Sequence, residues 1–213
     1  MVNDAVERVR TALLPLCEPL HDAFTWAEQV RRERLPELDD DPEYRWHATH
    51  TVRAFAHRRL KADIDELDLR PWQLSGNHAQ NGALWLTDGS YRVRLLHAIN
   101  EDDVPPPGPN RTRKAYYRNA PLAEVIPLFG EANDRLLVLW RIDPRTGMPT
   151  FRVVRPIGDW KWGHQQVTDL DFILPETTAE LASLRFDPSD DDLGIFLPSD
   201  AEEDEDGVDG FPR

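Results

Sequence analysis

The spacing of apolar residues changes near Pro71, and this change is the strongest constraint on the fold. Before it, apolar residues recur at intervals of three and four, as in Val6, Val9 and Leu13, which predicts amphipathic helices. After it, apolar and charged residues alternate, as in the segment 91–97, which predicts a strand with one buried face. A chain with helices first and strands afterwards belongs to the α+β class.

Prolines divide the first third of the chain into three expected helices. The first ends or kinks at Pro15, because proline lacks the backbone N–H that a helix interior needs. The second begins at Pro19 and ends before Pro36, with arginines near its C-terminus, where the helix dipole favours cations. The third spans about residues 42–61. Each helix has an apolar stripe that must pack against another surface.

The remaining chain predicts a small, mainly antiparallel sheet of four or five strands. Asp88-Gly89 supplies the positive φ values that a tight hairpin turn requires. Thr177 with Glu180 forms a capping-box pattern, which predicts a short helix after the sheet. The strands are expected at 84–86, 91–97, 136–142, 151–157 and 172–174. The sequence thus predicts N-terminal helices packed on this sheet.

Negative charge is concentrated at the end of the chain. Residues 190–213 hold ten acidic residues and one basic residue, so −9 of the net charge of −14 lies there. We expect residues 1–70 to form a helical segment, 71–188 a mainly β segment of the same domain, and 189–213 a disordered acidic tail. The folded part is close to charge balance, so the overall acidity does not exclude a polyanionic partner.

The composition is that of a folded, intracellular protein. Hydrophobic residues make up 40% of the chain, which is enough for a core. Cys17 is the single cysteine, so neither a disulfide framework nor a cysteine-rich zinc module is available. Charged residues interrupt the apolar N-terminus, and no run approaches the ~18 apolar residues of a membrane helix. We expect a cytoplasmic protein without a membrane partner.

The densest basic segment covers residues 110–118 and follows a proline-rich connector. Its cations attract phosphates, and its tyrosines offer rings on which bases stack. As a short helix it places Arg111, Lys114 and Arg118 together, because they are three and four residues apart. The alternative is a solvated loop whose tyrosines belong to the core and whose arginines pair with acids. The residues expected to bind RNA, DNA or a nucleotide are Arg111, Arg113, Lys114, Tyr116, Tyr117 and Arg118.

A second pattern joins Asp143 to Asp159 and Lys161. Asp143 follows one strand of the second hairpin and Asp159 follows its mate. We therefore expect the two carboxylates to meet at one end of the sheet and hold Mg²⁺, with Lys161 orienting a water. This arrangement resembles the core of PD-(D/E)xK nucleases, and the resemblance implies catalytic roles for all three residues. Plain turn chemistry is the alternative, because Asp143 precedes a proline, and Pro156 and Gly158 interrupt the strand.

Histidines supply two further candidate sites. His78 lies in a polar, glycine-flanked loop at 76–82, which suits a general acid or base close to a ligand, or a hydrogen-bonded turn. His47, His50 and His57 have helical spacing, which is the start of a metal site. No acid or cysteine completes that site, so packing histidines are favoured. Core packing is also expected for Cys17 and for the five tryptophans of the β half, which are Trp72, Trp85, Trp140, Trp160 and Trp162.

Four strings, at 76–78, 103–108, 115–119 and 151–162, resemble a family of small, uncharacterised actinobacterial proteins. The resemblance covers about residues 72–175. It implies an association with helix-turn-helix and metallopeptidase-type regulators, as in toxin and antitoxin pairs, and it assigns no catalytic residues.

Two hypotheses of function follow. In the first, the protein is a toxin-like or regulatory effector that engages nucleic acid or a nucleotide through the basic segment, and it is a nuclease if the metal site forms. Mg²⁺ is the cofactor only in that case. In the second, the protein is a non-catalytic interaction partner of an antitoxin-like regulatory system.

Overall fold

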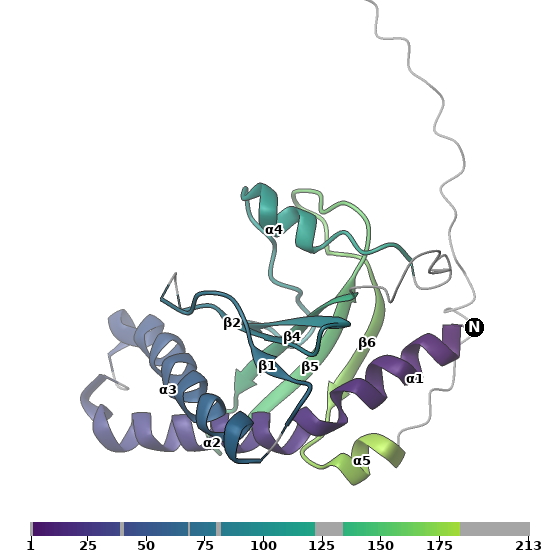
Figure 1. Cartoon of the computed structure of the whole chain (residues 1–213). Coiled ribbons are helices and arrows are strands. Elements are labelled where there is room, and N and C mark those ends of the chain that lie inside the picture. The colour runs from purple at the N-terminus through teal and green to yellow at the C-terminus, as the bar shows by residue number, and fades with distance from the viewer. Residues whose placement is uncertain (1, 39–40, 68, 80–81, 122–133, 184–213) are drawn as a thin grey trace, which may run out of the picture.

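A six-stranded sheet in the order β1-β2-β3-β4-β5-β6 organises the computed structural model (Figure 1). The structure describes residues 2–38, 41–67, 69–79, 82–121 and 134–183. The strands are β1 Gln73–Leu74, β2 Leu84–Thr87, β3 Tyr91–His97, β4 Asp134–Ile142, β5 Pro149–Pro156 and β6 Thr168–Leu174. The sheet has six strands, so the expectation of four or five is wrong, and the strand that was not expected is β1. This strand has two residues, which is too short for an alternating pattern, and it adds to the edge at β2.

The helices precede most of the sheet, which confirms the α+β order. They are α1 Val2–Leu13, α2 Cys17–Arg34, α3 Arg45–Glu66, α4 Arg111–Tyr116 and α5 Thr178–Ser183, with 3-10 turns at Leu14–Leu16, Pro36–Leu38 and Pro42–Tyr44. Pro15 lies in the turn between α1 and α2, as expected. Among the described residues, the structure contains no helix with the length and apolar character to cross a membrane.

All neighbouring strands pair antiparallel except β3 and β4, which are parallel from Tyr91 opposite Asp134 to His97 opposite Trp140. A parallel pair needs a crossover connection, because β4 must begin at the end of the sheet where β3 begins. That connection contains α4, which lies on one face of the sheet. The helices α1, α2 and α5 lie on the other face (Figure 1).

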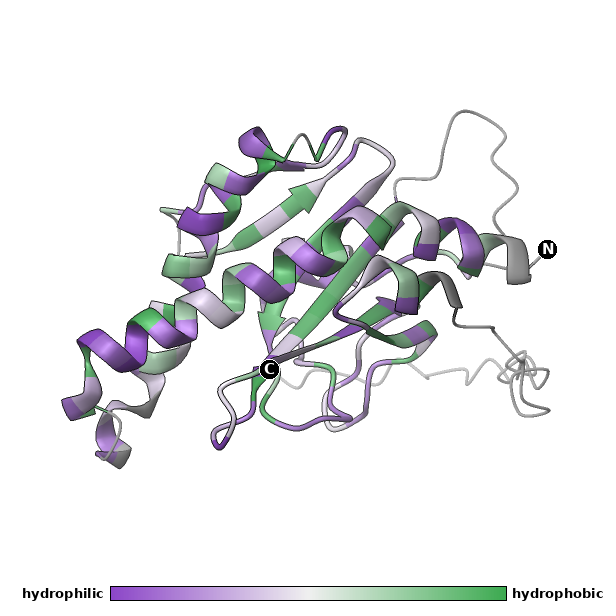
Figure 2. Cartoon of the chain, turned by 90° about the horizontal axis from the view of Figure 1, so that it is seen from below, coloured by the Kyte–Doolittle hydropathy of each residue, from purple (hydrophilic) through white to green (hydrophobic). Residues whose placement is uncertain are grey.

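The alternation of side chains gives the sheet two apolar faces. Val93, Leu95 and Val138 face the main core, where Phe24 of α2 meets Phe151 edge-on at 5.1 Å. Seen from this side, hydrophobic strands pass behind the amphipathic helices (Figure 2). A smaller core beneath α4 contains Leu137, Leu139, Val154 and both tyrosines of the basic segment. The sheet is therefore covered on both faces in this region.

A buried arginine joins three strands where β4 begins and β5 ends. Arg155 is 1% exposed and donates through Nε and Nη2 to Asp134, at 3.1 and 2.7 Å. Its Nη1 donates to Asp169 at 2.7 Å, and its Nη2 donates to the carbonyl of Ala120 at 2.9 Å. Hydrogen bonds on every side satisfy the buried charge, and they fix this end of the sheet.

The expected acidic tail at 189–213 lies outside the described residues.

Removing the Arg155 guanidinium should strongly destabilise the fold. Arg155→Met leaves Asp134 and Asp169 without their buried partner, so we expect the free energy of unfolding to fall by about 3–5 kcal/mol. The measurement is urea denaturation. Arg152→Met is the matched control on the same strand, because the Arg152–Asp171 ion pair is more open to solvent and should cost about 1 kcal/mol or less. Equal losses in the two variants would contradict the assignment.

Candidate nucleic-acid interface

The basic segment forms the short helix α4, which begins where the sequence allows it. Asn110 precedes the helix with an extended backbone, and its side-chain oxygen accepts a hydrogen bond from the Arg113 N–H at 3.1 Å. This is a standard N-cap, which satisfies a backbone donor that lacks a partner inside the helix. Of the two forms considered for the basic segment, a short helix and a solvated loop, the structure has the helix over Arg111–Tyr116.

The two tyrosines anchor α4 to the sheet. The Tyr116 hydroxyl donates to the carbonyl oxygens of Leu136, at 2.9 Å, and of Arg92. The Tyr117 hydroxyl donates to the Pro105 carbonyl oxygen at 2.6 Å. Burial raises the pKa of Tyr117 to about 12 and moves the pKa of Tyr116 further upward. Both rings are buried, so the expectation that Tyr116 and Tyr117 stack on bases is wrong.

Most cations of the basic segment remain accessible to solvent although the tyrosines are buried. Arg111, Arg113 and Arg118 are exposed, and Lys114 is half-buried. Arg113 precedes Tyr116 and Tyr117 by three and four residues, so it shares their side of the helix, and its charge also acts on Arg94. The alternative interpretation was correct in placing the tyrosines in the core, whereas most of the cations of the segment remain accessible.

The loop between β5 and β6, residues 157–167, brings two tryptophans to the surface. Trp162 is 86% exposed and Trp160 is half-buried, with their ring centroids 5.9 Å apart. Gly158 and Gly163 have positive φ angles, which let the chain turn sharply on each side of the pair. The expectation of core packing is confirmed for Trp72 and Trp140, and it is wrong for Trp160 and Trp162.

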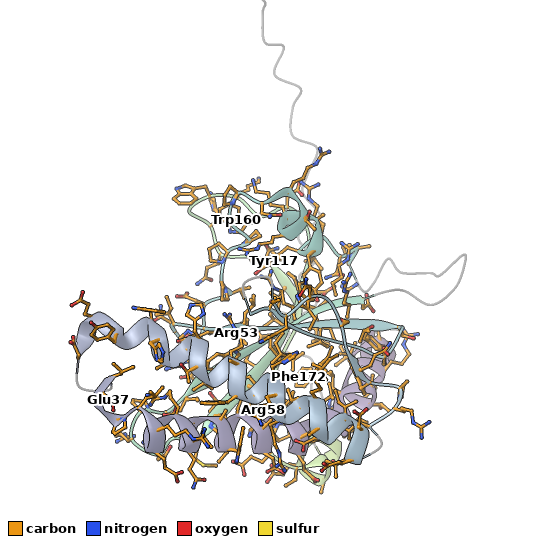
Figure 3. All side chains as sticks on the ribbon, turned by 60° about the vertical axis from the view of Figure 1, so that its left-hand side comes forward. Glu37, Arg53, Arg58, Tyr117, Trp160 and Phe172 are labelled. Atoms are coloured by element: carbon orange, nitrogen blue, oxygen red, sulfur yellow. The ribbon has the colours of Figure 1, made fainter. Side chains whose placement is uncertain are left out.

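Two contacts place this loop beside α4. The Lys114 ammonium lies 5.8 Å from the centroid of the Trp160 ring, which is a cation–π contact. Arg118 forms an ion pair with Asp159. The two segments lie side by side in Figure 1, and Figure 3 labels Trp160 of the loop and Tyr117, which follows α4. We call this surface the α4–loop face; it consists of Arg111, Arg113, Lys114, Arg118, Trp160, Lys161 and Trp162.

Further positive charge lies under α4. Arg92 and Arg94 of β3 place their guanidinium carbons 5.2 and 5.1 Å from the centroid of the Trp85 ring. Tyr116 meets the same ring edge-on at 5.0 Å. Arg94 is buried, and desolvation lowers its pKa, with a further contribution from the positive charge of Arg113. This cluster supports α4 and adds to the positive potential beneath it.

The structure separates Asp143 from Asp159 and Lys161, so the expected meeting of the two carboxylates is wrong. The strands β4 and β5 are antiparallel, with Ile142 opposite Pro149 and Leu137 opposite Val154. The start of β5 therefore lies beside Asp143, and its far end leads to Asp159. Five register steps at about 3.3 Å each already separate the two ends by about 17 Å.

Each of these residues has a local role instead. Asp143 accepts a hydrogen bond from the Arg145 N–H at 2.8 Å, which stabilises the turn and, with smaller contributions from Thr146 and the charge of Arg145, lowers the pKa of the carboxyl group. Asp159 pairs with Arg118, and Lys161 is exposed on the α4–loop face. In the part of the chain that the structure describes, no three His, Cys, Asp or Glu side chains are grouped to hold a metal ion.

His78 lies against α3. Its Nδ1 is 3.1 Å from the carbonyl oxygen of Ala83, and its ring stacks on His57 with centroids 3.7 Å apart. Burial lowers the pKa of His57, and the neighbouring His78 and Lys61 lower it further. The contact with Ala83 agrees with the hydrogen-bonded turn, and the stack, which was not predicted, connects His78 to α3.

The remaining single candidates are structural. His47 is 3.1 Å from the Thr51 hydroxyl, and His50 is 2.9 Å from a guanidinium nitrogen of Arg53. Cys17 is fully buried, and burial raises the pKa of its thiol to about 12, which disfavours the reactive thiolate.

Comparison of the chain with models of protein families, with curated proteins and with solved structures finds no match.

The free energy of unfolding should depend on pH through three histidines that are buried or half-buried in the folded protein. Burial lowers the pKa of His57, His21 and His97 in the folded protein, so the unfolded chain binds protons more readily. Stability should therefore fall as the pH drops below about 6.5, by less than about 1.4 kcal/mol per pH unit for each histidine. Urea denaturation between neutral and mildly acidic pH measures this slope. His57→Gln should flatten it, and the same change at the exposed His164 should not.

Proposed function

We propose that this protein binds single-stranded nucleic acid through the α4–loop face. The observation that carries the proposal is one surface that combines cations with the exposed Trp162 ring and the half-buried Trp160 ring, joined by the Lys114–Trp160 and Arg118–Asp159 contacts. Proteins that bind single strands without strict sequence preference combine these two features.

The charges of the surface favour a polyanion. Residues 110–121 and 157–167 contain five lysines and arginines and one acidic residue, Asp159. The cations neutralise phosphates, which releases condensed counterions and favours binding at low salt. Trp162 exposes nearly its whole ring, so a base can stack on it without rearrangement of the fold. An unpaired strand supplies such a base, whereas duplex bases are already stacked.

The proposal concerns binding and contains no cleavage step, because Asp143 and Asp159 lie at opposite ends of a strand pair. It is compatible with the toxin-like or regulatory effector that the resemblance to the actinobacterial family implies. The alternative is a protein partner from an antitoxin-like system that docks on Trp162. A protein partner of that kind would bind with weaker salt dependence, and this difference separates the two functions.

The acidic tail suggests regulation of this surface. Residues 190–213 hold −9 of the net charge, whereas the α4–loop face is cationic. We propose that the tail competes with nucleic acid for the α4–loop face, as a tethered polyanion whose local concentration is high.

Substitutions on the α4–loop face should weaken binding of a fluorescein-labelled single-stranded oligonucleotide, measured by fluorescence anisotropy. Trp162→Ala removes a stacking ring, which is worth about 1–3 kcal/mol, so we expect a loss of affinity of about tenfold or more. The double variant Arg111→Ala, Arg113→Ala removes two phosphate contacts. The slope of log K against log salt should therefore become shallower by about 1.4.

Matched controls keep this test specific. Trp46→Ala removes another exposed tryptophan, which lies on α3, and should not change the affinity. The double variant Arg58→Ala, Arg145→Ala changes the net charge equally at exposed positions on α3 and in the β4–β5 turn. Absence of salt-dependent binding by the unaltered protein to both RNA and DNA would overturn the proposed function. Equal losses in the control variants would overturn the assignment to this surface.

Deleting residues 190–213 should raise the affinity for the same oligonucleotide at low salt, because an intramolecular competitor is removed. The gain should disappear as salt screens the tail. A full-length variant with the tail acids changed to Asn and Gln should reproduce the gain, which separates charge from length. Unchanged affinity at low salt in both variants would contradict the competition.

A further inference from the structure

Arg94 of β3 is a buried cation without an acidic partner in the part of the chain that the structure describes. The residue is 9% exposed, and its Nε is buried without an acceptor, whereas the two Nη atoms are not among the fully buried atoms. Its guanidinium carbon lies 5.1 Å from the centroid of the Trp85 ring. This cation–π contact offsets only part of the cost of removing a charge from water.

The other buried arginines of the described chain differ from Arg94, because each has a carboxylate partner. The pairs are Arg10 with Glu7, Arg31 with Glu28, and Arg155 with Asp134 and Asp169. A carboxylate at hydrogen-bond distance compensates for the buried charge. An anion bound from outside the chain would give Arg94 the same compensation.

The charged groups that act on Arg94 are cations from two other elements. Desolvation is the main cause that lowers the pKa of Arg94, and the positive charges of Arg113 on α4 and Arg53 on α3 lower it further. Tyr116 and Tyr117 also lie close, but burial raises their pKa values, so both are neutral at neutral pH. Figure 3 labels Arg53 on α3 and Tyr117, which follows α4. Three strands and helices thus direct positive charge to the region around Arg94.

The burial of Arg94 favours the end of a nucleic-acid strand over its interior. A phosphodiester inside a strand carries one negative charge, and the chain continues on both sides of it. A terminal phosphate monoester carries about −1.5 to −2 charges at neutral pH and three strong acceptor oxygens. A strand end also needs less open surface than a continuous backbone to reach a guanidinium that is mostly buried.

We propose that Arg94, together with Arg113 and Arg53, binds the terminal phosphate of a single strand, while the adjoining nucleotides lie along the α4–loop face. The accessible Nη atoms of Arg94 donate to the phosphate oxygens, which is the pairing that the guanidinium group suits best. Arg113 belongs to the α4–loop face, so the two sites are continuous. This inference rests on the proposed function and adds the strand end as the preferred ligand.

The test compares oligonucleotides of one sequence that differ only in a terminal phosphate, by fluorescence anisotropy with the full-length protein. One pair has fluorescein at the 3′ end and a 5′-phosphate or 5′-hydroxyl, and the other has the reverse arrangement. In one of the pairs the phosphorylated strand should bind about tenfold more tightly or more, because it gains charge-assisted hydrogen bonds. The pair that responds identifies the bound end. Equal binding within both pairs would overturn this inference alone, whereas no binding to any strand would overturn the proposed function with it.

Arg94→Met locates the phosphate site. Methionine removes the charge and leaves no carboxylate unpaired, so urea denaturation should show a fold at least as stable as that of the control variant. The preference for the phosphorylated strand should disappear, while the hydroxyl strand still binds. Arg92→Met is the matched control, since Arg92 is an exposed arginine of β3 whose guanidinium carbon lies 5.2 Å from the same Trp85 ring. This control should keep the preference. A preference that survives in Arg94→Met, or one that is lost equally in Arg92→Met, would overturn the assignment to Arg94.

Discussion

The buried charge of Arg155 is the constraint on which the C-terminal half of the structure depends. Its guanidinium holds Asp134 of β4 and Asp169 of β6 together, and it also binds the carbonyl of Ala120. Close by, Asn119 donates to Pro156 and accepts from the Arg135 N–H. These bonds fix the exit from α4 relative to the start of the 157–167 loop. The α4–loop face therefore rests on a polar cluster, and its geometry is set by directed hydrogen bonds more than by apolar packing.

Much of the fold could be predicted because periodicity reports burial directly. The alternation in 91–97, the Asp88-Gly89 turn and the helical stripes each depend on local geometry, and the structure contains the elements they predict. β1 could not be predicted, since its two residues acquire strand geometry only by pairing with β2. The antiparallel register shows why the Asp143 prediction failed. Residues that follow the two strands of a hairpin lie at opposite ends of the pair, so sequence order alone argued against their meeting.

The candidate site was harder to predict, because the same residue type serves the core and the surface. Tyr116 and Tyr117 stand among cations in the sequence, yet they anchor the helix, while Trp162 projects from a turn. Helical spacing alone does not say which side of a short amphipathic segment meets the sheet. The available signal was the pair of glycines Gly158 and Gly163, which marks a loop directly after the strand expected at 151–157.

The single parallel pair, β3 with β4, sets an order of assembly for the chain. β4, β5 and β6 are joined by connections of moderate length, so their contacts are local in sequence. Pairing β3 with β4 requires closure of the whole segment 98–133, with a larger entropic cost before any contact forms. The three C-terminal strands should therefore associate early, and α4 reaches its place only when β3 docks beside β4. During synthesis or stress, a chain in which β3 has not yet paired with β4 would have the Trp160–Trp162 loop without the cations of α4 beside it.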